Sequence, residues 1–555
     1  MDLVYFVILV GVLIFVHELG HFAWAKFFRV KVLKFSLGFG PKLVGFRKGE
    51  TEYVIAAVPL GGYVKLLGEN PNDVVRPEDE ERAFTSQPLW KKVIIVVAGP
   101  AMNLVFPIIL YFVVFLGDSA LTPGVVGTVY PGRPADGLLE PGDRIVAIDD
   151  EEVETFYDVR RIIQDRAGEP LRFVVERDGE RLTHTITPTS ERVTRELERV
   201  DEVGVVGILP YHPTAVVGVT SPTSPAAAAG MVAFDVVISA AGRPIDRWLD
   251  LDRVFRGNRG TMVPLTYLRP RRIDRALDGL VEIDVLEPHV AAVTPEPGDE
   301  SGVSRAGLEV ADLYVSQITA GSPEHRMGLS SGDRLLELDG QPIARWDTFL
   351  EDLKADGPAE HQLTWRRGEE TITRTYELRR ERGVTEHGQP YDRYVVGMRN
   401  WVPMRIDPGV PNPNPIGYAM REAWGSTVEM VELTLLSVVR LLQGRLTVKS
   451  IGGPLTIFEV AGTAAREGTL NYLTLMAFIS INLGLINLLP IPLLDGGHLL
   501  IFLIEGVSRR KLSTKARQYA SLAGLVVLVL LMVLAFKNDI ERQWPQIVDR
   551  FSSTE

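Results

Sequence analysis

The chain has 555 residues, of which 46% are hydrophobic, and its mean hydropathy is slightly positive. Because the apolar residues occur in a few blocks, this composition indicates a membrane protein that carries soluble modules. The formal net charge of -12 argues against nucleic acid as a partner. The chain has no cysteine, which excludes disulfides, thiolate nucleophiles and cysteine-ligated zinc, so any metal must be held by His, Asp or Glu.

Four segments are long and apolar enough to form transmembrane helices, and we expect spans at residues 3–28, 93–116, 471–494 and 516–536. The first resembles a signal peptide, but Asp2 replaces the usual basic leader and no small-residue cleavage site follows, so we interpret it as a retained span. Residues 427–442 are a fifth candidate. They carry Glu429, Glu432 and Arg440 and fit an amphipathic helix on the membrane surface at least as well as a span.

Basic residues gather in two loops, one after the first span and one between the last two. They are Lys26, Arg29, Lys31, Lys34, Lys42, Arg47 and Lys48 in the first loop, and Arg509, Arg510, Lys511, Lys515 and Arg517 in the second. By the positive-inside rule both loops are expected in the cytoplasm, which puts both termini and the central region outside when there are four spans. A fifth span at 427–442 would place the two basic loops on opposite sides, so we prefer four.

The first predicted span ends in His17-Glu18-Leu19-Gly20-His21, an HExxH motif. Residues four apart share a helix face, so both imidazoles can reach one metal ion while Glu18 takes a proton from a metal-bound water. With nine histidines in the chain, the chance expectation of one such motif is on the order of 1%. Ionisable groups within a span are costly and mark function by default, which favours a metal site over histidines that merely face the membrane interface.

Alternating apolar residues and glycines in residues 32–68 predict a β-hairpin-like element between the first two spans. Irregular backbone at membrane depth is tolerated only where it faces protein or a water-filled cavity. Because this element directly follows the metal motif, residues 35–64, with the Gly38-Phe39-Gly40 turn, could hold an extended substrate by main-chain hydrogen bonds. An ordinary cytoplasmic hairpin explains the pattern equally well.

The central region, residues 120–400, contains a threefold repeat. Each copy has a leading glycine, then a turn that opens a short strand; the turns are Gly142-Asp143, Phe234-Asp235 and Gly332-Asp333. The unit, completed by a helix such as residues 347–354, resembles the PDZ domain of bacterial envelope proteases, which binds extended peptides or C-termini at a sheet edge. The second copy lacks the turn glycine, which leaves its peptide groove in doubt. Spacers or steric caps are the alternative interpretation of all three.

The third predicted span ends in NLLPIPLLDGGH, residues 487–498. Its prolines and glycines break the helix near Asp495, and the segment precedes the second basic loop, so it is expected at the same membrane face as HELGH. Alone, the segment would be interpreted as a turn; paired with HExxH, it makes Asp495 the predicted third ligand. His498 follows three residues later, but catalytic zinc keeps one position open for water, so we do not expect His498 as a fourth ligand.

Together, HELGH, the GFG turn, NLLPIPLLDGG and the PDZ-like repeats resemble the site-2 protease family of intramembrane zinc metalloproteases, in its bacterial regulator of sigma-E protease branch. The resemblance implies one zinc ion at His17, His21 and Asp495, with Glu18 as general base. It also implies a substrate cleft that includes Asn487, Pro490 and Pro492, with Gly38 and Gly40 in the adjoining turn.

The family cleaves single-span membrane proteins, such as anti-sigma factors and signal-peptide remnants, within the bilayer. The resemblance therefore implies such partners here, with the PDZ-like domains in the periplasm and the active site near the cytoplasmic face of the bacterial inner membrane. Relatives usually carry one or two PDZ domains, so the third copy leaves the gating of substrates open.

The sequence thus predicts a multi-pass α-helical membrane protein with four transmembrane helices and α+β PDZ-like domains inserted between the second and third spans. The expected parts are an N-terminal membrane part (1–118), three PDZ-like domains (119–200, a degenerate 201–300, and 301–400), a linker with amphipathic surface helices (401–470), a C-terminal membrane part (471–540) and a tail (541–555). Two alternatives are a non-catalytic PDZ-bearing receptor or scaffold, which would not require Glu18, and a metal transporter, which would need more ionisable groups in the other spans.

Overall fold

The computed structural model describes residues 1–69, 75–118, 120–194, 200–258, 260–276, 281–297, 302–355, 360–384, 390–446, 448, 452–510 and 512–552. The chain folds into two compact units. Unit 1 combines its two ends, Met1–Ser119 and Asn412–Glu555, and unit 2 comprises Ala120–Thr385 and Pro390–Pro411. Lys511, counted above in the second basic loop, lies outside the described residues.

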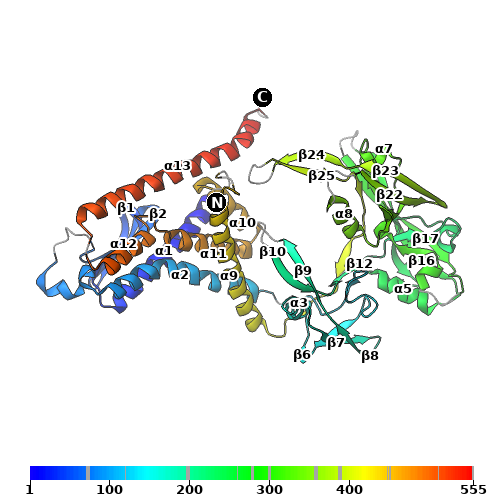
Figure 1. Cartoon of the computed structure of the whole chain (residues 1–555), viewed down its shortest axis with the longest axis horizontal. Coiled ribbons are helices and arrows are strands. Elements are labelled where there is room, and N and C mark those ends of the chain that lie inside the picture. The colour runs from blue at the N-terminus through cyan, green and yellow to red at the C-terminus, as the bar shows by residue number, and fades with distance from the viewer. Residues whose placement is uncertain are drawn as a thin grey trace. The chain divides into compact units, whose positions relative to one another are not determined.

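Unit 1 is mainly helical, with one β-sheet (Figure 1). Its helices are α1 (Asp2–Phe27), η1 (Pro77–Arg82), η2 (Phe84–Ser86), α2 (Leu89–Leu116), α9 (Pro415–Leu442), α10 (Pro454–Glu467), α11 (Thr469–Asn487), α12 (Asp495–Ser508) and α13 (Thr514–Ser552). Its strands are β1 (Val32–Lys48) and β2 (Thr51–Leu66), which agree with the predicted hairpin.

Four helices among the described residues are long and apolar enough to cross a membrane: Asp2–Phe27, Leu89–Leu116, Thr469–Asn487 and Lys515–Arg542. This number confirms the four predicted candidate spans, and α9, which contains the fifth candidate segment, is not among them.

Two helix ends differ from the prediction. The third span ends at Asn487 rather than at residue 494, because Pro490 and Pro492 cannot donate a backbone hydrogen bond and Leu493 adopts a left-handed backbone with φ of 100°. The last helix runs on to Ser552, so much of the predicted tail is helical.

The helices of unit 1 approach one another closely at small residues. A Cβ atom on Gly20 of α1 would lie 2.2 Å from the carbonyl oxygen of Ala98 in α2, and one on Gly484 of α11 would lie 3.1 Å from that of Pro100. Such contacts are how helices associate in lipid, where apolar side chains gain little by leaving the lipid. The buried cluster beside them draws side chains from α1, α2, α9 and α11: Leu9, Leu13, Leu110, Tyr111, Ala423, Met476, Ala477 and Ile481.

β1 and β2 of unit 1 are bent, so that one stretch of β1 pairs with two different stretches of β2. Residues 34–37 pair with 62–65 on one side and with 52–55 on the other. The bend follows Gly38 and Gly40, whose φ angles of +91° and +88° favour glycine. β2 packs against α1.

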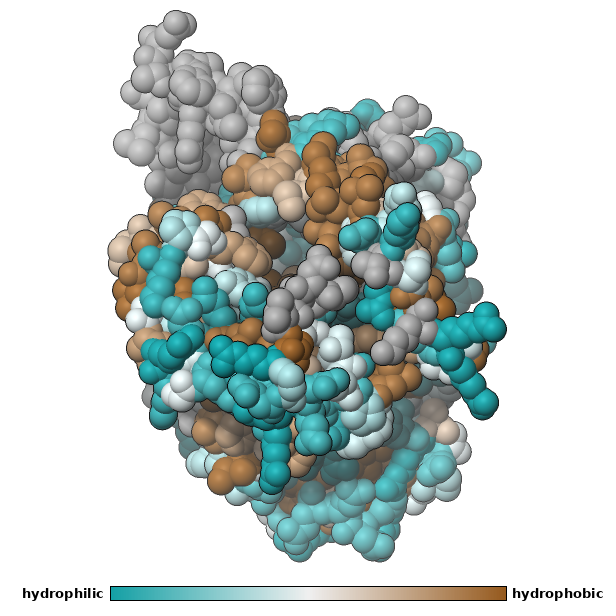
Figure 2. All heavy atoms as spheres, turned by 90° about the vertical axis from the view of Figure 1, so that its left-hand side faces the viewer, coloured by the Kyte–Doolittle hydropathy of each residue, from teal (hydrophilic) through white to brown (hydrophobic). Residues whose placement is uncertain are grey.

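Apolar side chains of this sheet are exposed, among them Leu43, Val44 and Phe46. Figure 2 views the molecule from the left-hand side of Figure 1, where hydrophobic and hydrophilic side chains lie next to one another. Exposed apolar residues on a sheet fit contact with lipid or with another chain better than contact with bulk water.

Unit 2 contains three repeats of one α+β fold, and the four-stranded sheets have matching orders, β6-β5-β7-β8, β15-β14-β16-β17 and β21-β20-β22-β23. Repeat 1 comprises β4 (Thr128–Val129), β5 (Arg144–Ile148), β6 (Glu151–Glu152), α3 (Phe156–Gln164), β7 (Leu171–Arg177), β8 (Glu180–Ile186) and β11 (Ile208–Leu209). Repeat 2 comprises β13 (Val217–Val219), α4 (Pro225–Ala228), β14 (Val236–Ala240), β15 (Arg243–Pro244), α5 (Trp248–Gly257), β16 (Val263–Ala276), β17 (Val281–Val293), α6 (Gly302–Arg305) and β18 (Leu308–Val310). Repeat 3 comprises η4 (Ala311–Leu313), β19 (Gln317–Ile318), α7 (Pro323–Arg326), β20 (Arg334–Leu338), β21 (Gln341–Pro342), α8 (Trp346–Ala355), β22 (Glu360–Arg367), β23 (Glu370–Glu377) and β26 (Met398–Arg399).

Each repeat has its own core and closes on itself. A short last strand pairs with a short first strand in β4–β11, β13–β18 and β19–β26. Val206 is buried in the first core and Leu308 in the second. The first two repeats therefore extend past the expected boundaries at residues 200 and 300, because the strand that closes each core comes late in the sequence.

A buried aspartate at the same place in each repeat fixes the turn before the central strand. It accepts a backbone N–H from the residue three positions earlier and pairs with an arginine from the neighbouring strand; the pairs are Asp143–Arg177, Asp235–Arg269 and Asp333–Arg367. All three arginines also donate to a backbone carbonyl of the preceding turn. Such charge-assisted, two-pronged bonds hold a turn more firmly than neutral ones.

Repeat 2 forms this turn without the glycine found in the other two. Phe234 has a φ of 72°, close to the values of Gly142 and Gly332, although a left-handed backbone costs a residue with a Cβ roughly 1–2 kcal/mol. Its ring is buried beside Ala311 and Tyr314, at the start of repeat 3. Apolar burial of the ring offsets the cost of the turn.

The remaining strands of unit 2 form short antiparallel pairs. They are β3 (Ala120–Leu121) with β28 (Val410–Pro411), β9 (Thr189–Thr194) with β10 (Val200–Val205), β12 (Tyr211–Pro213) with β27 (Met404–Ile406), and β24 (Arg379–Val384) with β25 (Pro390–Val395). The first and last strands of unit 2 are thus neighbours. Next to them, the Asn412 side-chain amide donates to the Asp118 carbonyl at 3.3 Å.

We expect Asp235→Ala to lower the free energy of unfolding of unit 2 by about 2 kcal/mol, because it removes two bonds to Arg269 and one to the backbone of the turn. The urea midpoint of unfolding is measured by brief protease digestion of the full-length protein in detergent across a urea series. Asp246→Ala is the control, since Asp246 pairs with Arg405 on the surface and such pairs contribute about 0.5 kcal/mol. Equal midpoints for the two variants would contradict the structural role of Asp235.

Candidate metal centre

Three side chains from two distant parts of the chain converge in unit 1. Nε2 of His17 lies 3.2 Å from Nε2 of His21 and 3.2 Å from Oδ2 of Asp495, and the His21–Asp495 distance is 3.4 Å. The histidines are one turn apart on α1, and Asp495 begins α12 just after the break in the chain that follows α11. The structure thus brings together the three residues for which the sequence predicts metal binding.

The triangle of atoms fits zinc. Ligand atoms about 2.0–2.1 Å from a tetrahedral zinc ion lie about 3.3 Å from one another, which matches the three distances above. Within the described residues, this is the one group of three His, Cys, Asp or Glu side chains close enough to share an ion. His498 is not part of the group, and three protein ligands leave a fourth position open for a substrate or water.

Helix α2 fixes the orientation of the His21 ring. Nδ1 of His21 lies 2.8 Å from the carbonyl oxygen of Ile95, so Nδ1–H donates there and Nε2 is left to face the centre. Gly99, one turn along α2, has no side chain in the way: a Cβ atom there would lie 2.2 Å from Nε2 of His21. Neither contact was predicted from the sequence, because each depends on how closely α1 and α2 pack.

Glu18 lies beside the triad, where the sheet meets α1. Its side chain is buried, it accepts a hydrogen bond from the backbone N–H of Val64, and a Cβ atom on Gly62 would lie 2.9 Å from its Cγ. Residues 62–65 form an outer edge of the sheet, since within the described part of the chain they pair only with residues 34–37. An edge of the sheet therefore runs past Glu18, a carboxylate beside the triad that is not a predicted ligand.

The other residues predicted to contact substrate occupy different places. Nδ2 of Asn487 lies 3.5 Å from Nδ1 of His17, at the end of α11. Gly38 and Gly40 lie against Val58 of β2, whereas the part of the sheet that meets α1 at Glu18 is residues 62–64.

Pro490 and Pro492 lie in the loop before Asp495. A Cβ atom on Gly524 of α13 would lie 1.7 Å from the carbonyl oxygen of Pro492, so the last helix packs directly against this loop.

The sequence analysis missed one polar residue at the centre. Asn103 of α2 is completely buried, and its Nδ2 lies 3.4 Å from Nδ1 of His17. A fully polar side chain inside an apolar span is itself a signal of function, and that signal was present in the sequence.

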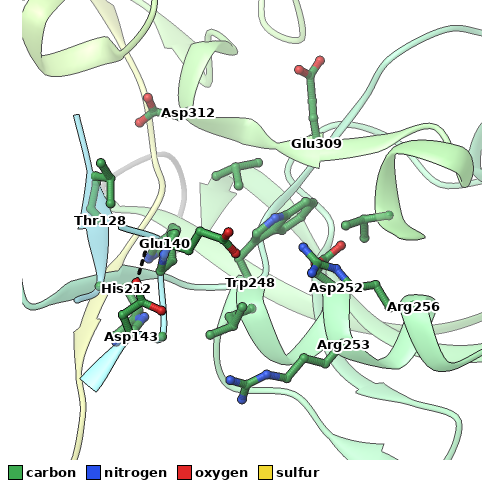
Figure 3. Close-up of a pocket in the computed structure, with 18 of the residues that line it drawn as sticks. Thr128, Glu140, Asp143, His212, Trp248, Asp252, Arg253, Arg256, Glu309 and Asp312 are labelled. Carbon is green, nitrogen blue, oxygen red and sulfur yellow. Dashed lines mark hydrogen bonds and ion pairs between the residues drawn. The ribbon is translucent and has the colours of Figure 1, made fainter. Parts of the chain in front are cut away.

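Unit 2 has a pocket of about 550 Å³ between repeats 1 and 2, with η4 and β27 also at its wall. In Figure 3, Trp248, Asp252 and Arg256 of α5 line one side and Thr128 and Glu140 of repeat 1 the other, and Glu140 points toward Trp248. The space beside α5 and β18 of repeat 2 is therefore partly walled by repeat 1.

Burial shifts the titration of two groups in this pocket. It lowers the pKa of His212, which the nearby Asp407 carboxylate partly opposes. It raises the pKa of Asp312 above its usual range. Both pKa shifts are toward the uncharged form of the group.

We expect Gly99→Ala to weaken metal binding at least tenfold, because the added methyl group overlaps the His21 ring and must displace Nε2. Zinc bound per chain, measured on purified protein at set free zinc concentrations, gives the affinity. Gly11→Ala in the same bundle is the control, since a Cβ atom there meets nothing within 4 Å. An affinity for Gly99→Ala within twofold of the control would show that His21 does not hold the metal in this geometry.

Comparisons with known proteins place this arrangement in a family. A family model described as Peptidase family M50 matches residues 5–531. Regulator of sigma-E protease RseP from Escherichia coli strain K12 is 29% identical over 558 residues, covering 98% of each chain. A relative from Neisseria meningitidis serogroup A, named "putative zinc metalloprotease", is 28% identical over 545 residues, covering 97% of this chain and 98% of its own. Among solved structures, the PDZ domain of an SdrC-like protein from Listeria monocytogenes aligns with 16% of this chain and 85% of its own, at 16% identity and a TM-score of 0.12. Because the family model spans most of the chain, this protein belongs to peptidase family M50.

Proposed function

We propose that this peptidase is an intramembrane zinc metalloprotease that hydrolyses peptide bonds in or beside the transmembrane segments of other membrane proteins. The observation that carries the proposal is the triangle of Nε2, Nε2 and Oδ2 atoms with sides of 3.2–3.4 Å, built on a helix long and apolar enough to cross a membrane. The names of the relatives, which include a sigma-E regulatory protease and a zinc metalloprotease, support the same activity.

His17, His21 and Asp495 are proposed to hold one zinc ion. Two neutral imidazoles and one carboxylate form a common ligand set for catalytic zinc, and they leave a position open. When bound, zinc activates water at neutral pH and polarises the carbonyl group of the scissile bond. The protein holds the three ligands in place through α2 and through the break that puts Asp495 at the start of α12.

Glu18 is the proposed general base. It neighbours His17 in the sequence, and its buried carboxylate lies at the triad. In this role its carboxylate accepts a proton from the attacking water and delivers it to the leaving amine, a function worth typically 10²–10⁴-fold in rate.

The edge at residues 62–65 is the proposed docking strand for substrate. A peptide bond inside a helix is shielded by its own turns, so a transmembrane substrate must unwind before it is cut. An added strand satisfies the main-chain groups of the unwound segment with those of the edge. The Val64 N–H points away from β1 and donates to the Glu18 carboxylate; an added strand would take over this donor, which would bring the extended substrate past the proposed base. Asn487, Pro490 and Pro492 are expected to form the opposite side of the cleft.

We infer that the substrates are single-span membrane proteins of the bacterial inner membrane. With the basic loops in the cytoplasm, the active site is expected near the cytoplasmic face and unit 2 in the periplasm. The three repeats share one strand order, and we propose that they are PDZ-like domains that bind extended or C-terminal peptide segments. The partly walled pocket of repeat 2 makes repeats 1 and 3 the better candidates for such binding.

We expect Glu18→Gln to lower the cleavage rate at least 100-fold while zinc binding stays within twofold of wild type, because the amide cannot accept the proton yet keeps the shape of the side chain. The assay uses purified protein in detergent with a single-span substrate, followed by gel shift and mass spectrometry of the products. Loss of zinc together with activity would mean that Glu18 supports the metal instead. Full activity of the variant would remove the proposed mechanism and leave the scaffold alternative.

A second arm uses the same substrate with and without a large folded domain on its periplasmic side. If unit 2 limits access by size, the trimmed substrate is cut faster, whereas equal rates would show that the repeats do not act as a steric filter.

We expect Val64→Pro to abolish substrate capture, because proline removes the outward N–H of the edge strand. Val64→Ala is the matched control: it loses the same side-chain packing but keeps the N–H. Both are made in the Glu18→Gln background, and co-purification of a tagged substrate is measured, so that capture is read independently of chemistry. Equal capture by the two variants would contradict strand addition at this edge.

A further inference from the structure

A buried amide in α2 has no role in the mechanism described so far. Asn103 is 0% exposed within a helix that is otherwise apolar at this depth. An unsatisfied polar group there costs several kcal/mol as an order of magnitude. The side chain must therefore serve an interaction that compensates this cost.

Among the described residues, the one side chain within hydrogen-bonding distance of the Asn103 amide is His17. The distance from Nδ2 of Asn103 to Nδ1 of His17 is 3.4 Å, while Oδ1 of Asn103 has no hydrogen-bond partner among the described residues. Nε2 of His17 faces the other two triad atoms. For Nε2 to offer its lone pair to a metal, the neutral ring must carry its proton on Nδ1.

That proton decides which end of the amide faces the ring. An NH2 group cannot accept from Nδ1–H, whereas a carbonyl oxygen can. A half-turn of the amide exchanges its two ends without moving the rest of the side chain. In either orientation the far end of the amide has no hydrogen-bond partner among the described residues, so the bond to His17 determines which orientation is favoured once a metal is bound.

We infer that Asn103 is a positioning residue for the metal centre: its Oδ1 accepts a hydrogen bond from Nδ1–H of His17 and so fixes the tautomer that leaves Nε2 free for the ion. This inference rests on the proposed metal centre. Asn103 would then do for His17 what Ile95 does for His21. The carbonyl oxygen of Ile95 lies 2.8 Å from Nδ1 of His21 and accepts the proton there, which leaves Nε2 of His21 free.

The two partners share one face of α2. Ile95, Gly99 and Asn103 follow one another at intervals of four residues, which places them along the same side of a helix. The carbonyl oxygen of Ile95 accepts a hydrogen bond from His21, and Gly99 leaves space for the His21 ring. Asn103 faces His17. One stripe of α2 thus supports both histidines.

Asn103 is held more firmly than the other amide near His17. The backbone carbonyl of Asn103 accepts a hydrogen bond of 2.8 Å from the hydroxyl of Ser480. The Asn103 Cβ also packs closely against Gly484, where an added Cβ atom would lie 3.2 Å from it. Asn487 lies 3.5 Å from the same Nδ1 and is partly exposed at the end of α11. Asn103 is therefore the fixed partner, and Asn487 stays available to substrate.

The test measures zinc affinity by competition with a chromogenic chelator, on the full-length protein in detergent. Asn103→Leu and Asn103→Ala remove the acceptor, and we expect each to weaken zinc binding 10–100-fold, the usual effect of losing the partner of a ligating histidine. Asn103→Asp keeps an acceptor of the same shape and is expected to restore affinity to within threefold of wild type. Asn482→Leu is the control and should bind like wild type, since Asn482 is a half-buried asparagine of α11 that accepts a hydrogen bond from Thr434.

The outcomes separate this inference from the proposed function. Rescue by Asp but not by Leu or Ala cannot arise from packing alone, because Leu and Asp are both close to Asn in size. Wild-type affinity in both Asn103→Leu and Asn103→Ala would overturn the positioning role while leaving the metal centre intact. If wild type and His17→Ala bound zinc equally weakly, the metal centre itself would be wrong.

Discussion

The convergence of two imidazoles and one carboxylate inside an apolar helical bundle is the constraint on which unit 1 depends. Polar groups at this depth are expensive unless each finds a partner. The fold meets this requirement in layers: the three side chains face one another, the outer nitrogen of His21 faces a backbone carbonyl of α2, and small residues let α1 and α2 approach closely enough for these contacts. The break after α11 belongs to the same solution, since a continuous helix would carry Asp495 away from the histidines.

Much of this could be predicted from local pattern. The four-residue spacing of His17 and His21 sets their common face because helical periodicity is fixed. Long apolar runs are sufficient to identify four candidate spans, and the prolines before Asp495 predict that the chain cannot continue as a helix there. The distribution of Lys and Arg placed both motifs at one face of the membrane, which is what made Asp495 a candidate ligand at all.

What could not be predicted depends on distances between elements that are remote in sequence. The role of Gly99 could not be predicted, because its sequence context is that of any small residue in a span and only the structure shows the His21 ring against it. The substrate-holding strand was expected somewhere within residues 35–64, and the bend in the sheet determines that residues 62–64 are the part beside Glu18. The repeats were found from their turns, yet their limits were set too early, because the strand that closes each core shows no distinctive pattern. Phe234 shows the same limit: its unfavourable turn is compensated by a ring contact with Tyr314 that only tertiary structure reveals.

The pairing of β3 with β28 has a consequence for how the chain is organised as a whole. Residues 120–411 depart from the helical part and return to it through two adjacent strands, and the flanking residues Asp118 and Asn412 are hydrogen-bonded to each other. The two ends of the inserted portion are therefore adjacent to one another. A change in the number of repeats between them would leave these two connections, and with them the spacing of the helices that carry the metal ligands, unchanged.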